Sequence, residues 1–148
     1  MCIHSHIYKL STNWRVKKKM NIGKASNLSR LSVKTVRYYS DIGIVKPEIN
    51  DSNGYREYSR NDVEMLKFVG KARKFNFSIL ECRELLSLYK NKKRTSKKVK
   101  TMTLEKINEI NEKIEELKIL RSQLSNLANN CRGDEEPHCP ILNEFAKK

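Results

Sequence analysis

Two short helical patterns follow one another in the segment NIGKASNLSRLSVKTVRYYSDIGIV, which starts at residue 21. Ser32 is suited to cap the start of the second helix, and Gly43 suits the position just past its end. Two short helices joined by a few residues form a helix-turn-helix. The apolar positions predicted to face inward are Ile22, Ala25, Leu28, Val33, Val36 and Tyr39.

The other side of the second helix carries Lys34, Arg37 and Tyr38. Basic and phenolic side chains on such a helix can reach phosphates and base edges when the helix enters a major groove. These three residues are therefore predicted to contact DNA. Arg73, in a basic cluster at the end of a later helix, is a further predicted DNA contact.

The next segment, VKPEINDSNGYREYS, has the pattern of a β-hairpin. Pro47 stops a helix, and Asn53 followed by Gly54 predicts a type I′ turn. Tyr55 and Arg56 begin the returning strand. A hairpin directly after a helix-turn-helix forms a wing, so we expect both residues to contact the DNA backbone beside the groove.

Two further helices are predicted, and each opens with a capping motif. Ser59 is followed by Asp62 at the first helix, and Ser78 is followed by Glu81 at the second. Cys82 lies among apolar neighbours and is interpreted as a small buried hydrophobe. The inward positions predicted for the second of these helices are Ile79, Leu80, Leu85, Leu86 and Leu88.

The longest helical pattern covers residues 96–129 and follows a polar, basic linker at residues 90–95. Its apolar positions recur at steps of three and four residues, which is the spacing of a coiled coil, and Arg121 interrupts them. A single helix of this length cannot bury such a seam against so small a domain, so we predict an antiparallel coiled coil between two protomers. The seam consists of Ile107, Ile110, Ile114, Leu117 and Leu124, with Leu120 and Leu127 alongside.

Charge and composition narrow the class of protein. The chain has 148 residues and a formal net charge of +14. Residues 1–75 hold 16 Lys and Arg against 6 Asp and Glu, which makes nucleic acid the leading partner. No apolar run approaches the roughly 18 residues of a membrane-spanning helix, and no secretion signal is evident, so we expect a cytoplasmic protein with no membrane partner. No nucleophile–base pair, phosphate-binding glycine loop or paired carboxylates indicate an enzyme.

Residues 1–19 are polar and basic without clear periodicity, and they are predicted to form a disordered arm. Cys2, His4 and His6 alternate within this arm. Alternating ligands on a flexible arm make a weak chelate, so we do not expect a metal site there.

Five motifs occur in a fixed order and carry a family resemblance: SVKTVRYY, NGYREY, KARKFNFS, TLEKINEINEKIEEL and LANNCRGDEEPHCPI. Over residues 20 to about 142 the chain resembles the MerR family of bacterial transcription activators, and closely its copper-efflux regulator branch. The resemblance implies a mainly α fold. A winged helix-turn-helix head would cover residues 20–89, a long antiparallel dimerisation helix residues 96–129, and a metal-binding loop with a short helix residues 130–148.

The resemblance also implies a function. Family members bind, as homodimers, double-stranded promoter DNA whose spacer between the polymerase elements is too long. On sensing their ligand they bend and untwist this DNA so that RNA polymerase can use both elements. The chain would then remain on its operator with or without metal, and activation would depend on DNA deformation.

Cys131 and Cys139, with seven residues between them, lie in an acidic loop beyond the long helix. The pair is open to three interpretations: a disulfide, a metal clamp or a structural loop. A cytoplasmic location disfavours a disulfide. Pro140 suits the first position of a short helix, which places Cys139 near the positive helix end. Two thiolates with few other donors suit Cu(I), Ag(I) or Au(I), whereas zinc favours about four ligands.

In the family, metal selectivity follows a residue that the partner protomer contributes from the start of its dimerisation helix. This residue is Ser in the copper branch and Cys in the zinc and mercury branches. The matching position here is Ser96, which leaves two thiolates as the ligands. Arg132 stands where close relatives have proline, and His138 offers an imidazole that would broaden the site toward Zn(II) or Co(II).

Three other functions stay open at this stage. One is a zinc-type regulator, and a second is a thiol-redox regulator in which the two cysteines form a disulfide under oxidant. A third, of a different class, is a copper-buffering protein whose basic head binds DNA without sequence preference. A buffer of that kind would show only the salt-dependent, sequence-independent component of DNA binding.

Overall fold

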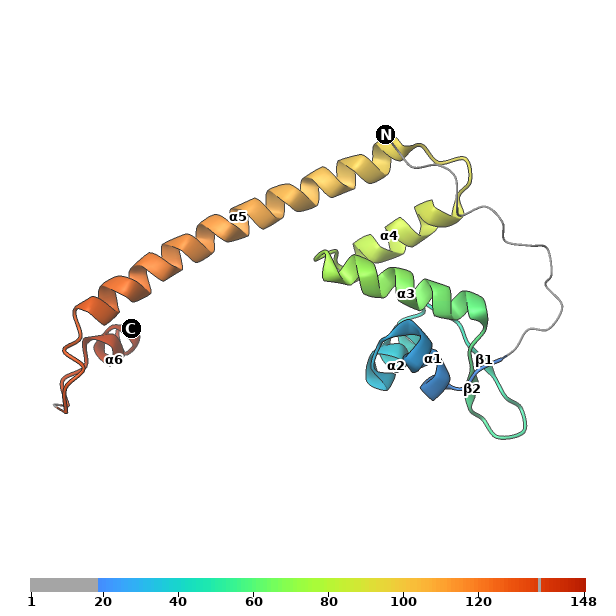
Figure 1. Ribbon diagram of the computed structural model, residues 1–148, viewed down its shortest axis with the longest axis horizontal. Helices are drawn as coiled ribbons and strands as arrows, with labels where there is room; N and C mark the ends of the chain where they lie inside the picture. The colour runs from blue at the N-terminus through green and yellow to red at the C-terminus, as the bar shows by residue number, and fades with distance from the viewer. Residues whose placement is uncertain (1–18, 136) are drawn as a thin grey trace. The chain divides into compact units, whose positions relative to one another are not determined.

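The computed structural model describes residues 19–135 and 137–148, and it divides the chain into two compact units at Arg94 and Thr95. Figure 1 shows a mainly helical chain whose long helix lies in the second unit. The predicted arm up to residue 18, with Cys2, His4 and His6, lies outside the described residues.

In the residues that the structure describes, the first unit contains four helices and a two-stranded hairpin, and the second unit contains two helices. Within the first unit, α1 packs against α2 and α3, and α3 packs against α4. This arrangement confirms the prediction of a mainly α fold with a winged helix-turn-helix head and a long helix after it. The elements of the first unit are α1 (Ile22–Ser29), α2 (Val33–Asp41), β1 (Glu48–Ile49), β2 (Arg56–Glu57), α3 (Arg60–Lys74) and α4 (Ile79–Lys90); those of the second are α5 (Ser96–Asn129) and α6 (Pro140–Phe145).

The predicted helix starts are present as hydrogen bonds. Ser32 Oγ accepts a hydrogen bond from the backbone N–H of Thr35 at 3.0 Å and caps α2. Complete capping boxes open α3, with Ser59 and Asp62, and α4, with Ser78 and Glu81. The ends of α1 and α2 rely on left-handed backbone, at Arg30 (φ 56°) and at Gly43 (φ 75°). Local capping therefore sets where the head's helices begin and end.

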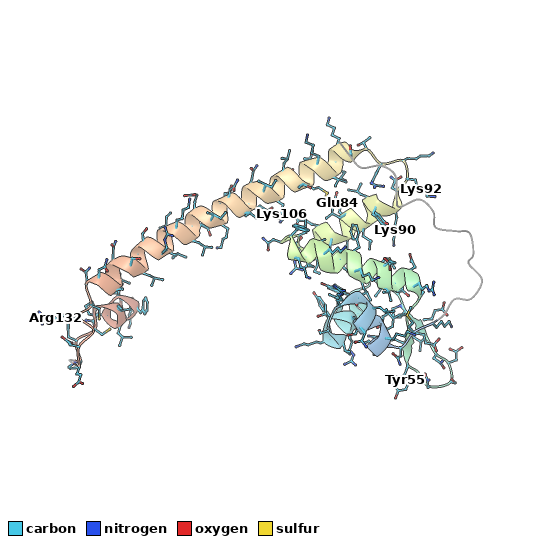
Figure 2. All side chains as sticks on the ribbon, in the orientation of Figure 1. Tyr55, Glu84, Lys90, Lys92, Lys106 and Arg132 are labelled. Atoms are coloured by element: carbon cyan, nitrogen blue, oxygen red, sulfur yellow. The ribbon has the colours of Figure 1, made fainter. Side chains whose placement is uncertain are left out.

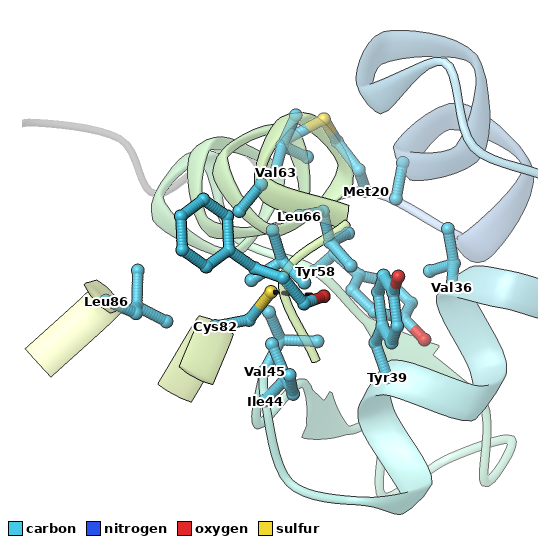
Figure 3. Close-up of a cluster of buried hydrophobic side chains, with 14 residues drawn as sticks. Met20, Val36, Tyr39, Ile44, Val45, Tyr58, Val63, Leu66, Cys82 and Leu86 are labelled. Carbon is cyan, nitrogen blue, oxygen red and sulfur yellow. Dashed lines mark hydrogen bonds between the residues drawn. The ribbon is translucent and has the colours of Figure 1, made fainter. Parts of the chain in front are cut away.

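The core of the head gathers side chains from all four helices and from the wing (Figure 3). Tyr58 is fully buried, and its hydroxyl lies 2.9 Å from Ser40 Oγ. Because Ser40 donates its own proton to the Val36 carbonyl, the Tyr58 hydroxyl is the donor in this pair. Cys82 is fully buried as well, and burial raises the pKa of its thiol. The largest fully buried side chains are Tyr58, Leu66, Val36, Val45, Val69 and Cys82.

Three positions predicted to face inward are exposed instead. The exposed fractions are 46% for Leu28, 38% for Val33 and 77% for Leu80. Each lies in the first or last turn of its helix, where the neighbouring helices of this small core do not reach. Helical spacing identifies the apolar stripe, but it does not show how far along the stripe the contact extends.

The wing pairs β1 with β2 in antiparallel register, so that Glu48 faces Glu57. Lys19 forms ion pairs with both carboxylates, at 2.7 Å and 3.3 Å, and offsets their repulsion. The prediction of a type I′ turn at the Asn-Gly pair is wrong. The loop is longer than two residues, because the Asn50 N–H donates to the Tyr55 carbonyl, and only Gly54 in the loop has a positive φ, whereas type I′ needs two.

In the second unit, α5 spans the predicted residues 96–129. Its seam side chains are largely uncovered, with exposed fractions from 37% at Ile110 to 55% at Leu124. The short helix α6 packs against α5 (Figure 1). Among the described residues, no helix is long and apolar enough to span a membrane.

Candidate DNA-binding face and thiol loop

The two sides of α2 differ in burial. Val36 and Tyr39 are buried, whereas Lys34, Arg37 and Tyr38 are exposed. The exposed three occupy positions i, i+3 and i+4 of the helix and therefore share one face. The structure thus brings the three predicted contacts of this helix together on one solvent-facing surface. This arrangement is able to present two cations and a phenol to a groove.

Arg37 also lines a cleft between α2 and the wing, with a volume of about 580 Å³. Tyr55 and Arg56 line the same cleft, so the structure brings together the predicted contacts of α2 and of the wing. Tyr55 is 73% exposed at the wing (Figure 2). Lys19 and Asn21 line the cleft as well. A polyanion lying along this cleft would meet positive charge from the helix and the hairpin together.

Arg56 is held within this cleft by an ion pair. Its Nη2 donates to Asp41 Oδ1 at 2.6 Å, so the wing is joined to the end of α2. Sequence reasoning missed the role of Asp41, because fifteen residues separate the partners and no local pattern links them. The ion pair orients the Arg56 guanidinium, which lines the same cleft as Arg37.

Arg73 lies apart from this cleft and does not line it. Its Nη1 donates to the carbonyl of Phe77 at 2.6 Å, which closes the turn between α3 and α4. Burial raises the pKa of the Tyr39 hydroxyl and of the Cys82 thiol, and the nearby Arg73 charge opposes both shifts. The observed contacts of Arg73 are thus internal to the head, and its contact with DNA stays a prediction.

A second, smaller depression of about 380 Å³ runs between α1 and α3. Lys24 and Arg60 line it, and sequence reasoning did not single out either residue. Lys67 lines it too, and its ammonium pairs with Glu64 at 2.9 Å. The only sequence signal for these residues was the overall positive charge of the first half of the chain.

The two cysteines lie at the two ends of the loop between α5 and α6. The Cys131 N–H donates to the Ala128 carbonyl, so this residue continues the last turn of the long helix. Cys139 is the N-cap of α6, with Pro140 at its first position as predicted. Gly133, with a φ of 64°, lets the loop turn between them. Arg132 lies on the same loop (Figure 2).

Both thiols are free and partly exposed. Across residues 19–135 and 137–148, no group of three or more His, Cys, Asp or Glu side chains is arranged to hold a metal ion. His138 therefore does not complete a three-ligand group with the two cysteines. The donor set that the loop offers is two soft sulfur atoms, which fits a metal of low coordination number.

Ser96 is the first residue of α5 and is exposed. The 34 residues of this helix separate Ser96 from Cys131 by about 50 Å at 1.5 Å per residue. A pocket that contains both residues therefore needs Ser96 from a second copy of the chain.

Two family models match the chain: "MerR HTH family regulatory protein" over residues 20–88 and "MerR, DNA binding" over residues 63–127. The chain is 47% identical over 127 residues to the HTH-type transcriptional regulator HmrR of Rhizobium leguminosarum bv. viciae, covering 86% of this chain and 98% of that protein. It is 40% identical to the HTH-type transcriptional regulator CueR of Yersinia pestis, covering 86% and 91%.

Among solved structures, the chain is similar to the transcription regulator PbrR691 from Ralstonia metallidurans CH34 in complex with lead(II). The TM-score is 0.72 at 26% identity, and the match covers 86% of this chain and 99% of that one. The relatives are named as transcription regulators, which confirms the prediction that the protein is not an enzyme. With its winged helix-turn-helix head and long second-unit helix, the chain belongs to the MerR family of helix-turn-helix regulators.

Proposed function

We propose that this protein is a Cu(I)-responsive transcription activator that binds promoter DNA as a homodimer and switches on copper-efflux genes from the cytoplasm. The observation that carries the proposal is the pair of free thiols, Cys131 and Cys139, at the two ends of one loop. No third ligand joins them within the part of the chain that the structure describes.

DNA binding is supported by the shared face of Lys34, Arg37 and Tyr38 and by the adjoining cleft that Tyr55 and Arg56 line. The family match over residues 20–88 supports it independently. In this proposal α2 enters the major groove, and the wing contacts the flanking phosphates. Arg73 contributes through the turn that it closes, or through a phosphate contact.

The homodimer is supported by the uncovered seam of α5. Ile114 and Leu117 are 44% and 54% exposed, so covering the remaining surface yields about 1 kcal/mol for each side chain. A second α5 offers a matching apolar surface. Pairing two long helices through such a seam is the usual coiled-coil arrangement.

The metal assignment follows from ligand chemistry. Two thiolates with a monovalent ion leave one net negative charge, and a soft donor pair suits Cu(I), and equally Ag(I) and Au(I). Ser96 of the second copy would add only a hydroxyl, which is a poor ligand for a soft metal. The named relatives support a response to metals, because they include regulators called CueR and one solved with lead(II).

The activation step that we propose is a distortion of DNA rather than a change in occupancy. The dimer occupies its operator with or without metal. Metal binding changes the dimer so that it bends and untwists an overlong promoter spacer, and RNA polymerase then engages both promoter elements. The energetic cost of the step is the deformation of the DNA.

The test is titration of the fully reduced protein with Cu(I) and with Zn(II), in competition with chelators of known affinity. Tight binding of one Cu(I) per protomer with weak Zn(II) binding is the expected result. Tight Zn(II) binding would bring His138 into the site and indicate a zinc-type regulator. Binding of neither metal would favour the redox regulator. Tight Cu(I) binding without preference for a promoter sequence would indicate a copper buffer.

A further inference from the structure

The seam of α5 determines which residues of two antiparallel α5 helices face one another. In a two-fold antiparallel pair, the numbers of facing residues always add up to the same total, because one helix ascends as the other descends. Three successive pairs along the seam share one total, so a single register buries the whole seam. These pairs are Ile107 with Leu124, Ile110 with Arg121, and Ile114 with Leu117.

The same register places the start of one α5 beside the thiol loop of the other protomer. In this register the last helical residue of one α5, Asn129, would lie at the same height as Met102 of the second copy, so residues 96–101 would extend past the end of the partner helix. They lie beside the loop that follows it, which contains Asp134 and Glu135.

The start of α5 and the loop that carries the cysteines have opposite charges. The first turn of α5 contains no acidic residue, and Lys97 is exposed there. Asp134 and Glu135 are exposed on the loop. The seam continues toward the start of α5 at alternating steps of four and three residues, from Ile107 through residues 103 and 100 to Ser96. Lys97 therefore lies beside the seam, and Lys98 lies on the outward side of the helix.

We propose that Lys97 of one protomer pairs with the carboxylates of Asp134 and Glu135 of a second copy of this chain, at both ends of the dimer. The contact holds the loop that carries both cysteines against the neighbouring protomer. It also selects the antiparallel orientation, because a parallel pair would place the two basic helix starts together and the two acidic loops together. The inference rests on the proposed homodimer.

Each such exposed ion pair changes an association constant by only about 1.4- to 5-fold, and salt screens it. The contact occurs twice per dimer, and reversing the charge replaces attraction by repulsion. We therefore expect Lys97→Glu to weaken dimerisation about tenfold at low salt. The triple variant Lys97→Glu/Asp134→Lys/Glu135→Lys restores dimerisation to within about twofold, because every chain then carries both halves of an inverted pair. Lys98→Glu is the matched control, since it makes the same change on the outward side of the same turn, and it alters dimerisation less than about twofold.

The decisive measurement is zero-length carbodiimide cross-linking of the dilute full-length protein, with mass spectrometry of the linked peptides and sedimentation of the same sample. An amide between Lys97 and Asp134 or Glu135 is the expected product. It cannot form within one chain, because α5 separates these residues by about 50 Å.

A dimer without this link, a dimer linked in another register, or equal weakening by Lys97→Glu and Lys98→Glu would overturn the inference and leave the homodimer intact. A monomer at every concentration would overturn the homodimer of the proposed function as well.

Discussion

The two units of the chain differ in how completely they bury their apolar side chains. The head buries residues such as Tyr58, Leu66 and Val69 completely within its own helices and wing. In contrast, α5 leaves its seam, from Ile107 to Leu124, more than a third exposed. The head therefore buries its apolar side chains by itself, whereas α5 has an apolar face that a second chain would cover in the proposed dimer. The chemistry follows the same division, with the predicted DNA contacts in the head and the thiols in the second unit.

The division of chemistry is tested first by removing one thiol. Cys131→Ser or Cys139→Ser should abolish the transcriptional response to Cu(I), because one thiolate cannot form a two-coordinate clamp. Operator binding, measured by fluorescence anisotropy, should stay nearly unchanged. Cys82→Ser is the control, since this thiol is buried in the head and is not part of the loop. Loss of operator binding in either loop variant would contradict the separation of the two functions.

The seam is tested by Ile114→Asp. Each dimer would lose two Ile contacts and would place two carboxylates in an apolar seam, so dimerisation should weaken by about 3–6 kcal/mol. Sedimentation velocity should show monomers, and circular dichroism should show a head that is still folded. Ile119→Asp, the same substitution on the outward side of the helix, where the side chain is exposed, provides the control. An unchanged dimer in the Ile114 variant would rule out this seam as the interface.

The head core is tested by Leu66→Ala. This side chain is fully buried, and its truncation should lower the free energy of unfolding by about 2–5 kcal/mol. Because the core of the head is formed within one chain, the loss of stability in the Leu66 variant should not depend on protein concentration. The loss of stability in the Ile114 variant should depend on it. Thermal unfolding at two concentrations separates the two, and a Leu66 effect that vanishes at high concentration would refute a head that buries its core by itself.

The DNA face is tested by Arg37→Ala. If Arg37 contacts a base, its loss should weaken operator binding by about 1–3 kcal/mol. If it contacts a phosphate, the slope of the logarithm of the binding constant against the logarithm of salt concentration should fall by about one. Cu(I) binding should be retained. Lys118→Ala, on the second unit, removes the same charge elsewhere. Similar losses in both variants would mean that only the net charge of the chain matters.

The smallest expected effect concerns the wing. The Asn50 amide donates to Glu57, which lowers the pKa of that carboxyl, and Lys19 adds to the shift. A lowered pKa in the folded state stabilises the wing above the ordinary pKa of Glu, and this contribution is lost as the pH falls through the lowered value. Asn50→Ala should raise the pKa of Glu57 toward its ordinary value, as followed by NMR titration. No change would show that the hydrogen bond does not hold the carboxylate in solution.

Features that depend on nearby residues followed from the sequence by itself. The Ser caps, the glycine after α2 and the span of α5 were all predicted, because each depends on residues within about one helical turn or on a repeated spacing. The two cysteines on a loop after a helix end were equally a local feature. The family resemblance also came from short segments, because each of the five motifs is a local stretch of sequence.

Only the tertiary structure decided the features that join distant segments. It showed that Arg56 pairs with Asp41, that Arg73 closes the turn at Phe77, and that Tyr58 donates to Ser40. It also showed where the apolar stripes stop being covered, as at Leu80. These outcomes depend on which surfaces meet once the helices pack. Spacing along the chain encodes the face of a helix, whereas the neighbour that covers this face is decided by the packing of the whole unit.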